Sequence, residues 1–257
     1  MRLLAFALSG LLVGSFLTVA ITRLPAGERV GRGRSRCPRC GAVILARDNI
    51  PVVSWLLLRG RCRSCGEPIS PEYPIIEALT AALFLGAAAV FEPLELAIGA
   101  AVFLGVMTAV TFIDARHKIV PNRIIYPSLV AFGVAIGVGD LLGERVDALR
   151  ALIGMVAYAG PLLLIALIVP GGMGMGDVKL AALIGLALGS IGLEYVAVAA
   201  GVGIISGGLG AVTAVTILRY GRKQQIPFGP FLAGGAVVAT LLGPQIADLY
   251  LRMTGLS

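Results

Sequence analysis

Charged residues are scarce in this sequence: only 14% of the 257 residues are Asp, Glu, Lys or Arg, whereas 58% are hydrophobic. A soluble domain usually has about 25% charged and about 45–50% apolar residues, so this composition excludes an ordinary soluble protein. The alternation of polar and apolar residues that marks strands is nearly absent as well. Helices are then the expected way to cross a bilayer. The sequence therefore predicts an all-α polytopic membrane protein.

Features of nucleic-acid binding are also missing, although ten of the 21 Lys and Arg residues lie between Arg23 and Arg63. Neither interleaved aromatic residues nor a nucleic-acid-binding fold motif accompanies this cluster. Beside a membrane helix, such a cluster is typical of a cytoplasmic loop that its charge holds inside and against anionic lipid. We therefore expect a lipid bilayer, and no nucleic acid, as a partner.

Apolar runs that approach the roughly 20 residues needed for a membrane helix occur eight times. They cover residues 3–22, 75–91, 95–113, 124–139, 148–169, 178–191, 194–217 and 228–250. Only Arg2 precedes the first run, so we expect a retained helix with its N-terminus outside, and not a signal peptide. The loops that then fall inside carry 17 Lys and Arg residues against four elsewhere, a strong positive-inside bias.

All four cysteines lie in the polar insert, residues 23–74, between the first two spans. They form two C-x₂-C-G knuckles, Cys37/Cys40 and Cys62/Cys65. Two such knuckles can present four thiolates tetrahedrally to one Zn²⁺, with the glycines permitting tight turns. Disulfides are the alternative, and a cytoplasmic location argues against them. We predict a closed, structural zinc site that folds the insert, and a division of the chain into 1–22, 23–74 and 75–257.

Acidic residues are rare beside the apolar runs, and two of them stand at helix ends on the same predicted membrane face. Asp114 ends the third span in "FIDARHKIVPN", and Asp177 opens the sixth in "GMGDVKL". Because a charge at mid-bilayer costs about 2.5–3.5 kcal/mol on insertion scales, such carboxylates usually mark a functional or water-lined place. Two facing carboxylates can share one proton: the ionised group then activates water and the protonated group polarises a carbonyl. That is the chemistry of aspartic proteases.

Structural interpretations of these residues stay open. Asp177 could be a plain N-cap, and Asp114 could snorkel near the basic residues that follow it. The glycines at 174–176 are expected to adopt positive φ and to let a substrate strand approach. Lys179 is expected to point away from Asp177, toward lipid headgroups. His117, the only histidine, is interpreted as a solvated loop residue and not as a base.

Seven motifs follow one another nearly end to end. They are "GSFLTVAITRLP", "SRCPRCGAVI", "DNIPVVSWLLLRGRCRSCGEPIS", "YPIIEALTA", "FIDARHKIVPN", "GMGMGDVKLAALIG" and "IPFGPFLAGGA". In this order they resemble the bacterial type IV prepilin peptidases, which also serve type II secretion. In the last motif, two prolines and Gly229 are expected to delay the final helix and to shape a wall of a substrate cleft, while Pro in a first helical turn is the plain reading.

The resemblance implies a membrane aspartic protease of the GxGD type with Asp114 and Asp177 as its catalytic pair. Such enzymes lie in the bacterial inner membrane and remove the basic leader of prepilins or pseudopilins on the cytoplasmic side. They then methylate the new N-terminus with S-adenosylmethionine, and the cysteine-bearing insert belongs to this bifunctional branch. No residues can be assigned to the methyl donor, since a strand–GxGxxG–helix unit is missing. Glycines and acidic residues around Glu67 to Glu77 are the nearest candidates.

Three other functions remain open at this point. The chain could be a peptidase without methyltransferase activity. It could be a non-enzymatic membrane adaptor whose zinc module recruits a partner. It could also be a small transporter or channel that uses two intramembrane carboxylates as a proton relay.

Overall fold

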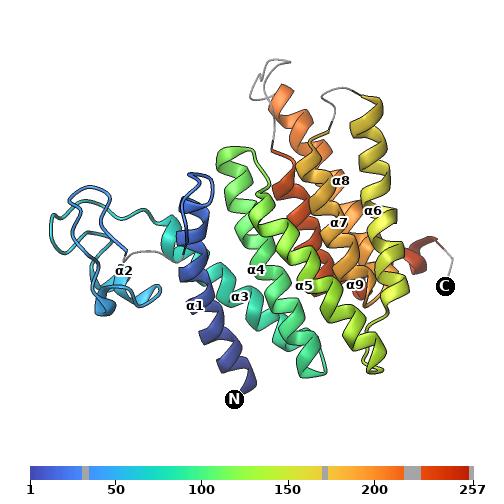
Figure 1. Ribbon diagram of the computed structural model, residues 1–257, viewed down its shortest axis with the longest axis horizontal. Coiled ribbons are helices and arrows are strands. Elements are labelled where there is room, and N and C mark those ends of the chain that lie inside the picture. Colours follow the sequence, from blue (N-terminus) through green and yellow to red (C-terminus); the bar gives the residue numbers. More distant parts are fainter. Residues whose placement is uncertain (31–34, 170–172, 217–226, 255–257) are drawn as a thin grey trace. The chain divides into compact units, whose positions relative to one another are not determined.

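The computed structural model describes residues 1–30, 35–169, 173–216 and 227–254, and this part of the chain is almost entirely helical (Figure 1). The described part has no strand longer than an isolated β-bridge. The helices are α1 (Arg2–Arg23), the 3₁₀ helix η1 (Ala46–Asp48), α2 (Val53–Leu57), α3 (Glu72–Val90), α4 (Leu94–His117), α5 (Asn122–Leu141), α6 (Ala148–Ile168), α7 (Met175–Gly189), α8 (Leu193–Thr216) and α9 (Gly229–Thr254).

The eight longer helices, α1 and α3 to α9, correspond one for one to the eight apolar runs and confirm the predicted fold class. Seven of them are long and apolar enough to span a membrane. The exception is α7, whose 15 residues are too few for that criterion. At 1.5 Å per residue it measures about 22 Å, short of the roughly 30 Å hydrocarbon core.

Some residues of the sequence analysis lie outside the described part of the chain. They are Arg32 and Arg34 of the arginine cluster, Gly171 and Gly172 of the glycine run, Ile226 of the last motif, and Arg219, Arg222 and Lys223 of the last predicted inside loop.

Residues 1–109 form a first compact unit, in which α1 packs along α3. The backbones approach closely, because a Cβ added at Gly14 would come within 2.7 Å of the Glu77 Cα. Buried side chains such as Ile21, Ile76 and Phe84 form the apolar interior. The insert with η1 and α2 lies between these two helices in the sequence, which confirms its predicted position.

Residues 110–257 form the second unit, and α7 is its central helix, packed against α5, α6, α8 and α9 (Figure 1). Nine of the 15 residues of α7 are buried, which explains why so short a helix is so apolar. The closest packing is with α6, where a Cβ added at Gly154 would come within 2.9 Å of the Gly189 Cα. Such contacts between small residues let membrane helices approach one another. The last two turns of α4, from Val110, belong to this unit.

Candidate active site and metal centre

Asp114 is a buried carboxylate near the C-terminal end of α4. Its residue exposure is 4%, and its Oδ2 atom accepts a hydrogen bond from the backbone N–H of Gly229 at 3.0 Å. A snorkelling carboxylate would instead reach the solvent, so that interpretation of Asp114 is wrong. The partner comes from the first residue of α9, 115 positions further along the chain. The backbone N–H of Gly229 therefore holds the Asp114 side chain in place.

Asp177 lies in the first turn of α7 and is not its N-cap. The cap is Gly174, which has no side chain, and the backbone N–H of Asp177 donates to the Gly174 carbonyl at 3.0 Å. The N-cap interpretation is therefore wrong as well. A carboxylate in the first turn still gains from the partial positive charge of the helix N-terminus. The residue is half-buried, whereas Gly174 and Met175 beside it are exposed, so this end of α7 is accessible.

The glycines before Asp177 provide space, and the expected positive φ is wrong for both that are described. Gly174 has an ordinary extended conformation, with φ −75° and ψ 135°, and Gly176 lies within α7. A Cβ at Gly176 would come within 2.9 Å of the Val120 Cβ, and one at Gly174 within 3.1 Å of the Asp177 Oδ2. Side chains here would therefore crowd the carboxylate and the chain after α4.

Asp114 and Asp177 both belong to the second unit. Asp114 lies near enough to Asp177 for a Coulombic interaction between the two groups. Lys179, two residues on, is directed to α5: its Nζ donates to the Asn122 Oδ1 at 3.2 Å and lies 5.0 Å from the centre of the Tyr126 ring. The expectation that Lys179 turns away from Asp177 agrees with these contacts, although the partners are protein groups and not the expected lipid headgroups.

The contact of Gly229 with Asp114 was not predicted from the sequence. A Cβ at this position would come within 2.6 Å of the Asp114 Oδ2, so a larger residue could not keep the same hydrogen bond without a shift. The helix does begin here, with Pro230 in its first turn as predicted. The signal was present in "PFGPF", a glycine where a helix-forming residue would otherwise stand, but its partner could not be read from the sequence.

The four cysteines form one cluster in the first unit. Their sulfurs all lie within 4.8 Å of one another, and those of Cys37 and Cys65 are 3.9 Å apart. With Zn–S bonds of about 2.3 Å, a tetrahedral site separates its sulfurs by about 3.8 Å. All four are free thiols, which disagrees with the disulfide alternative. The spacing and the all-thiolate donor set fit a structural zinc ion held by Cys37, Cys40, Cys62 and Cys65.

The two knuckles have the same backbone geometry. In the first, the N–H of Gly41 donates to the Cys37 carbonyl at 2.9 Å, and in the second the N–H of Gly66 donates to the Cys62 carbonyl at 2.9 Å. Gly41 and Gly66 have φ of 71° and 72°, the left-handed conformation that glycine adopts without strain. The predicted function of the knuckle glycines is therefore confirmed.

The first knuckle also favours a thiolate. The backbone N–H groups of Cys40 and Arg39 point at the Cys37 sulfur and lower its pKa to about 7 from the usual thiol value. A thiol must lose its proton to bind zinc, and this local geometry favours that loss at Cys37, whereas burial and the neighbouring thiols raise the pKa of Cys65.

Comparison with known proteins assigns both halves of the chain. Residues 8–91 match the bacterial peptidase A24 N-terminal domain, and residues 101–219 match the type IV leader peptidase family. A protein of Bacillus subtilis (strain 168) named prepilin leader peptidase/N-methyltransferase is 35% identical over 95% of this chain and 96% of its own length. The chain belongs to the type IV leader peptidase family.

Other relatives of this leader peptidase carry the same name. The one from Aeromonas hydrophila is 35% identical, and the one from Dichelobacter nodosus 36% identical, each over 95% of this chain and 92% of its own length. No solved structure matches the chain. Family membership makes the protein an enzyme, a multi-pass membrane peptidase, and removes the adaptor and transporter alternatives.

Proposed function

We propose that Asp114 and Asp177 are the catalytic pair with which this leader peptidase cleaves type IV prepilins or type II secretion pseudopilins. The observation that carries the proposal is the pairing itself: a buried carboxylate of α4, held by the N–H of Gly229, interacts with a carboxylate at the N-terminus of α7.

The reaction needs one proton shared by the two carboxyl groups. The ionised group takes a proton from a water molecule, whose oxygen then attacks the scissile carbonyl carbon. The protonated group donates to the carbonyl oxygen as charge develops there. When the C–N bond breaks, the leaving amine takes a proton, and the pair returns to its starting state of one shared proton.

The scissile bond has to be extended at this site, because a helical peptide bond is shielded by its own hydrogen bonds. Gly174 and Met175, exposed at the start of α7, lie where an extended substrate could approach Asp177. We propose that the apolar helix of the substrate stays in the membrane while its leader lies at the cytoplasmic face. The excess of Lys and Arg in the loops assigned to that side, 17 against four, supports this orientation in a bacterial inner membrane.

The second activity is N-methylation of the new N-terminus, as the names of the relatives indicate. When bound, S-adenosylmethionine supplies an electrophilic methyl group: a C–N bond forms, the C–S bond breaks, and sulfur keeps its electron pair. The product amine then loses its extra proton to water.

The functional division proposed is 1–22 as the first helix, 23–74 as the zinc-folded insert and 75–257 as the peptidase. This functional division differs from the division into compact units, whose boundary lies between Ala109 and Val110.

One assay tests both halves of the proposal. The purified protein is incubated with a prepilin and isotopically labelled S-adenosylmethionine, and the products are analysed by intact-mass spectrometry. We expect loss of the leader followed by a mass gain of one labelled methyl group. Cleavage without any methyl gain would support the peptidase without methyltransferase activity, and an uncut prepilin would reject the proposal.

A further inference from the structure

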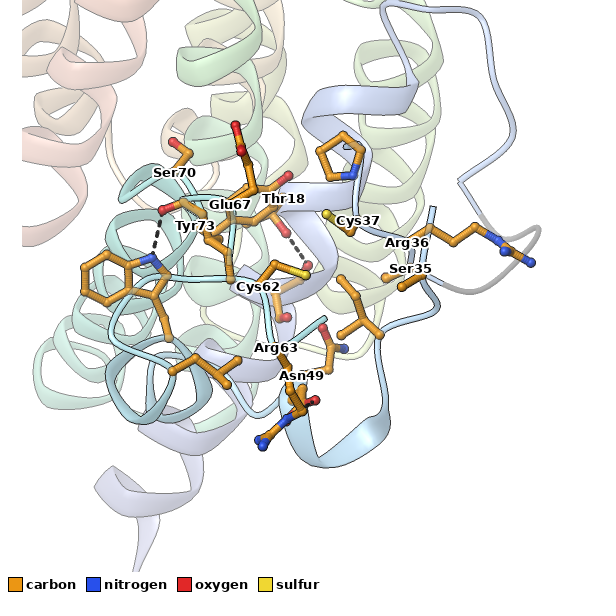
Figure 2. Close-up of a pocket in the computed structure, with 18 of the residues that line it drawn as sticks. Thr18, Ser35, Arg36, Cys37, Asn49, Cys62, Arg63, Glu67, Ser70 and Tyr73 are labelled. Atoms are coloured by element: carbon orange, nitrogen blue, oxygen red, sulfur yellow. Dashed lines mark hydrogen bonds and ion pairs between the residues drawn. The ribbon is translucent and has the colours of Figure 1, made fainter. Parts of the chain in front are cut away.

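A cavity of about 490 Å³ lies in the first unit, lined by α1, the two knuckles and the start of α3 (Figure 2). This volume falls within the range of about 300–1,000 Å³ that is typical of small-molecule sites. The four cysteine sulfurs lie within 4.8 Å of one another, so one metal ion would take up only a small part of it. The cavity therefore leaves room for an organic ligand beside the metal centre.

A buried carboxylate forms part of the cavity wall. Glu77 of α3 is only 7% exposed, and its Oε2 accepts a hydrogen bond from the Val52 N–H at 2.7 Å. Glutamate is seldom buried so fully without a partner or a function. Val52 itself has φ of 61°, an outlier for a β-branched residue, and such strain tends to collect at ligand sites. Glu77 thus holds a strained segment against the cavity.

Aromatic and hydroxyl-bearing side chains also line the cavity. Trp55 and Tyr73 line the cavity, and the indole N–H of Trp55 donates to the Ile69 carbonyl at 3.1 Å, which restrains the ring (Figure 2). Thr18 and Ser70 add hydroxyl groups. Four arginines also line the cavity. Arg63 pairs with Asp48 and Arg39 with Glu67, whereas Arg23 and Arg36 donate to the backbone carbonyls of Val30 and Gly41.

We propose that this cavity binds S-adenosylmethionine, with Glu77 facing the positive charge of the ligand. The methyl donor carries a flat adenine, ribose hydroxyls, a sulfonium and an ammonium group. The aromatic rings suit the adenine, since ligand pockets combine apolar walls with a few placed polar groups. A buried carboxylate suits a cation and disfavours phosphorylated nucleotides, whose charge is negative. The inference rests on the methyltransferase half of the proposed function.

Trp55 fluorescence reports on ligand binding in the cavity, because Trp55 lines the cavity and is the only tryptophan in the chain. Full-length, zinc-loaded protein in detergent is titrated with S-adenosylmethionine while Trp55 fluorescence and the heat of binding are recorded. We expect a saturable change of fluorescence at the concentrations where calorimetry shows binding. Calorimetric binding that leaves Trp55 fluorescence unchanged would place the ligand elsewhere and overturn the inference.

The charge of Glu77 is tested by Glu77→Gln, which keeps an oxygen to accept the Val52 N–H. We expect affinity for S-adenosylmethionine to fall at least tenfold, with zinc content and thermal unfolding unchanged. The matched control is Glu95→Gln, an exposed glutamate in the first turn of α4 outside the cavity, which should bind as the native protein does. Equal affinities of the Glu77→Gln and native proteins would contradict the proposed contact.

Photocrosslinking keeps the inference testable even if Glu77→Gln misfolds. Native protein is irradiated with radiolabelled S-adenosylmethionine and digested, and we expect label in peptides from residues 48–77. Label confined to peptides from residues 110–254, with methylated product still formed, would overturn the cavity assignment and leave the proposed function intact. Absence of both binding and methylated product would instead overturn the inference together with the methyltransferase half of the proposal.

Discussion

The cysteine insert and the α4–α7 site are held together in opposite ways. In the insert, each ligand is placed by its immediate neighbours: two knuckles of a few residues have matching hydrogen bonds and matching glycine turns. At the aspartate pair, the contacts come from residues far apart in the chain, such as Gly229 and Asp114. A site built from local turns depends on its metal, whereas one built from helix packing depends on how closely backbones can approach.

The largest effect is expected from removal of a zinc ligand. Because the insert has little apolar core of its own, Cys37→Ser or Cys62→Ser should abolish stoichiometric zinc and expose the insert to proteolysis. Structural zinc contributes apparent binding free energies of about 10–16 kcal/mol in small zinc-finger peptides. Metal analysis and limited proteolysis measure both outcomes.

Ser64→Ala is the control for the cysteine variants, since Ser64 lies between Cys62 and Cys65 and is not a ligand. It should keep its zinc. Zinc retained at one ion per chain in either cysteine variant would reject the four-thiolate site.

A second prediction concerns the close approach at Gly229. In Gly229→Ala the new Cβ would meet the Asp114 Oδ2 at 2.6 Å, so the carboxylate has to move. A misplacement of about 1 Å can cost about a hundredfold in rate, and we expect a loss of about 10- to 100-fold in leader cleavage. Steady-state cleavage of a prepilin measures this effect.

Gly234→Ala is the matched control on the same helix, because a Cβ there meets nothing within 4 Å. It should cleave at the native rate. If Gly229→Ala were as active as Gly234→Ala, the hydrogen bond to Asp114 would have no part in catalysis.

A third prediction separates packing from chemistry in the second unit. Gly154→Ala inserts a methyl group where α6 meets α7, and overpacking of this kind typically costs about 1–3 kcal/mol. Gly160→Ala, also on α6, has only the Val156 Cγ1 at 3.9 Å and should change little. Thermal unfolding in detergent compares the two, and equal midpoints would show that α6 and α7 are not packed so closely.

The smallest effect is expected at the ion pair of Asp48 and Arg63. The Arg63 guanidinium donates to both carboxylate oxygens and lowers the pKa of Asp48 below its usual value. The pair therefore stabilises the insert above the ordinary aspartate pKa of about 3.9, and this contribution is lost as the pH falls through the lowered pKa. Asp48→Asn should be slightly more susceptible to protease at neutral pH, with the difference from native disappearing in acid. A difference that grows in acid would contradict this sign.

The sequence predicted local features well. The knuckle turns follow from C-x₂-C-G, and the ends of the spans 148–169 and 194–217 lie within one residue of those of α6 and α8. Apolar runs and glycine turns depend on neighbours in the chain, so these features can be read from short stretches.

Long-range features could not be predicted in the same way. Gly229 and Asp114 are 115 residues apart, and their hydrogen bond forms only when distant helices pack. The same holds for the strained backbone of Val52, whose N–H donates to Glu77. The shortness of α7 has the same cause: other helices surround it, so it does not need the length of a membrane span. No local pattern indicated that Gly174 would cap this helix and leave Asp177 in its first turn.

The most direct test of the account compares Asp114→Asn and Asp177→Asn with Asp140→Asn, an exposed aspartate near the end of α5. Each purified variant is incubated with a prepilin, and the fraction without its leader is followed by intact-mass spectrometry. Loss of a general acid or base typically costs about 10²–10⁴-fold, so the first two should cut at least a hundredfold more slowly, and Asp140→Asn at the native rate. Native-rate cleavage by either Asp114→Asn or Asp177→Asn would contradict the paired-carboxylate site.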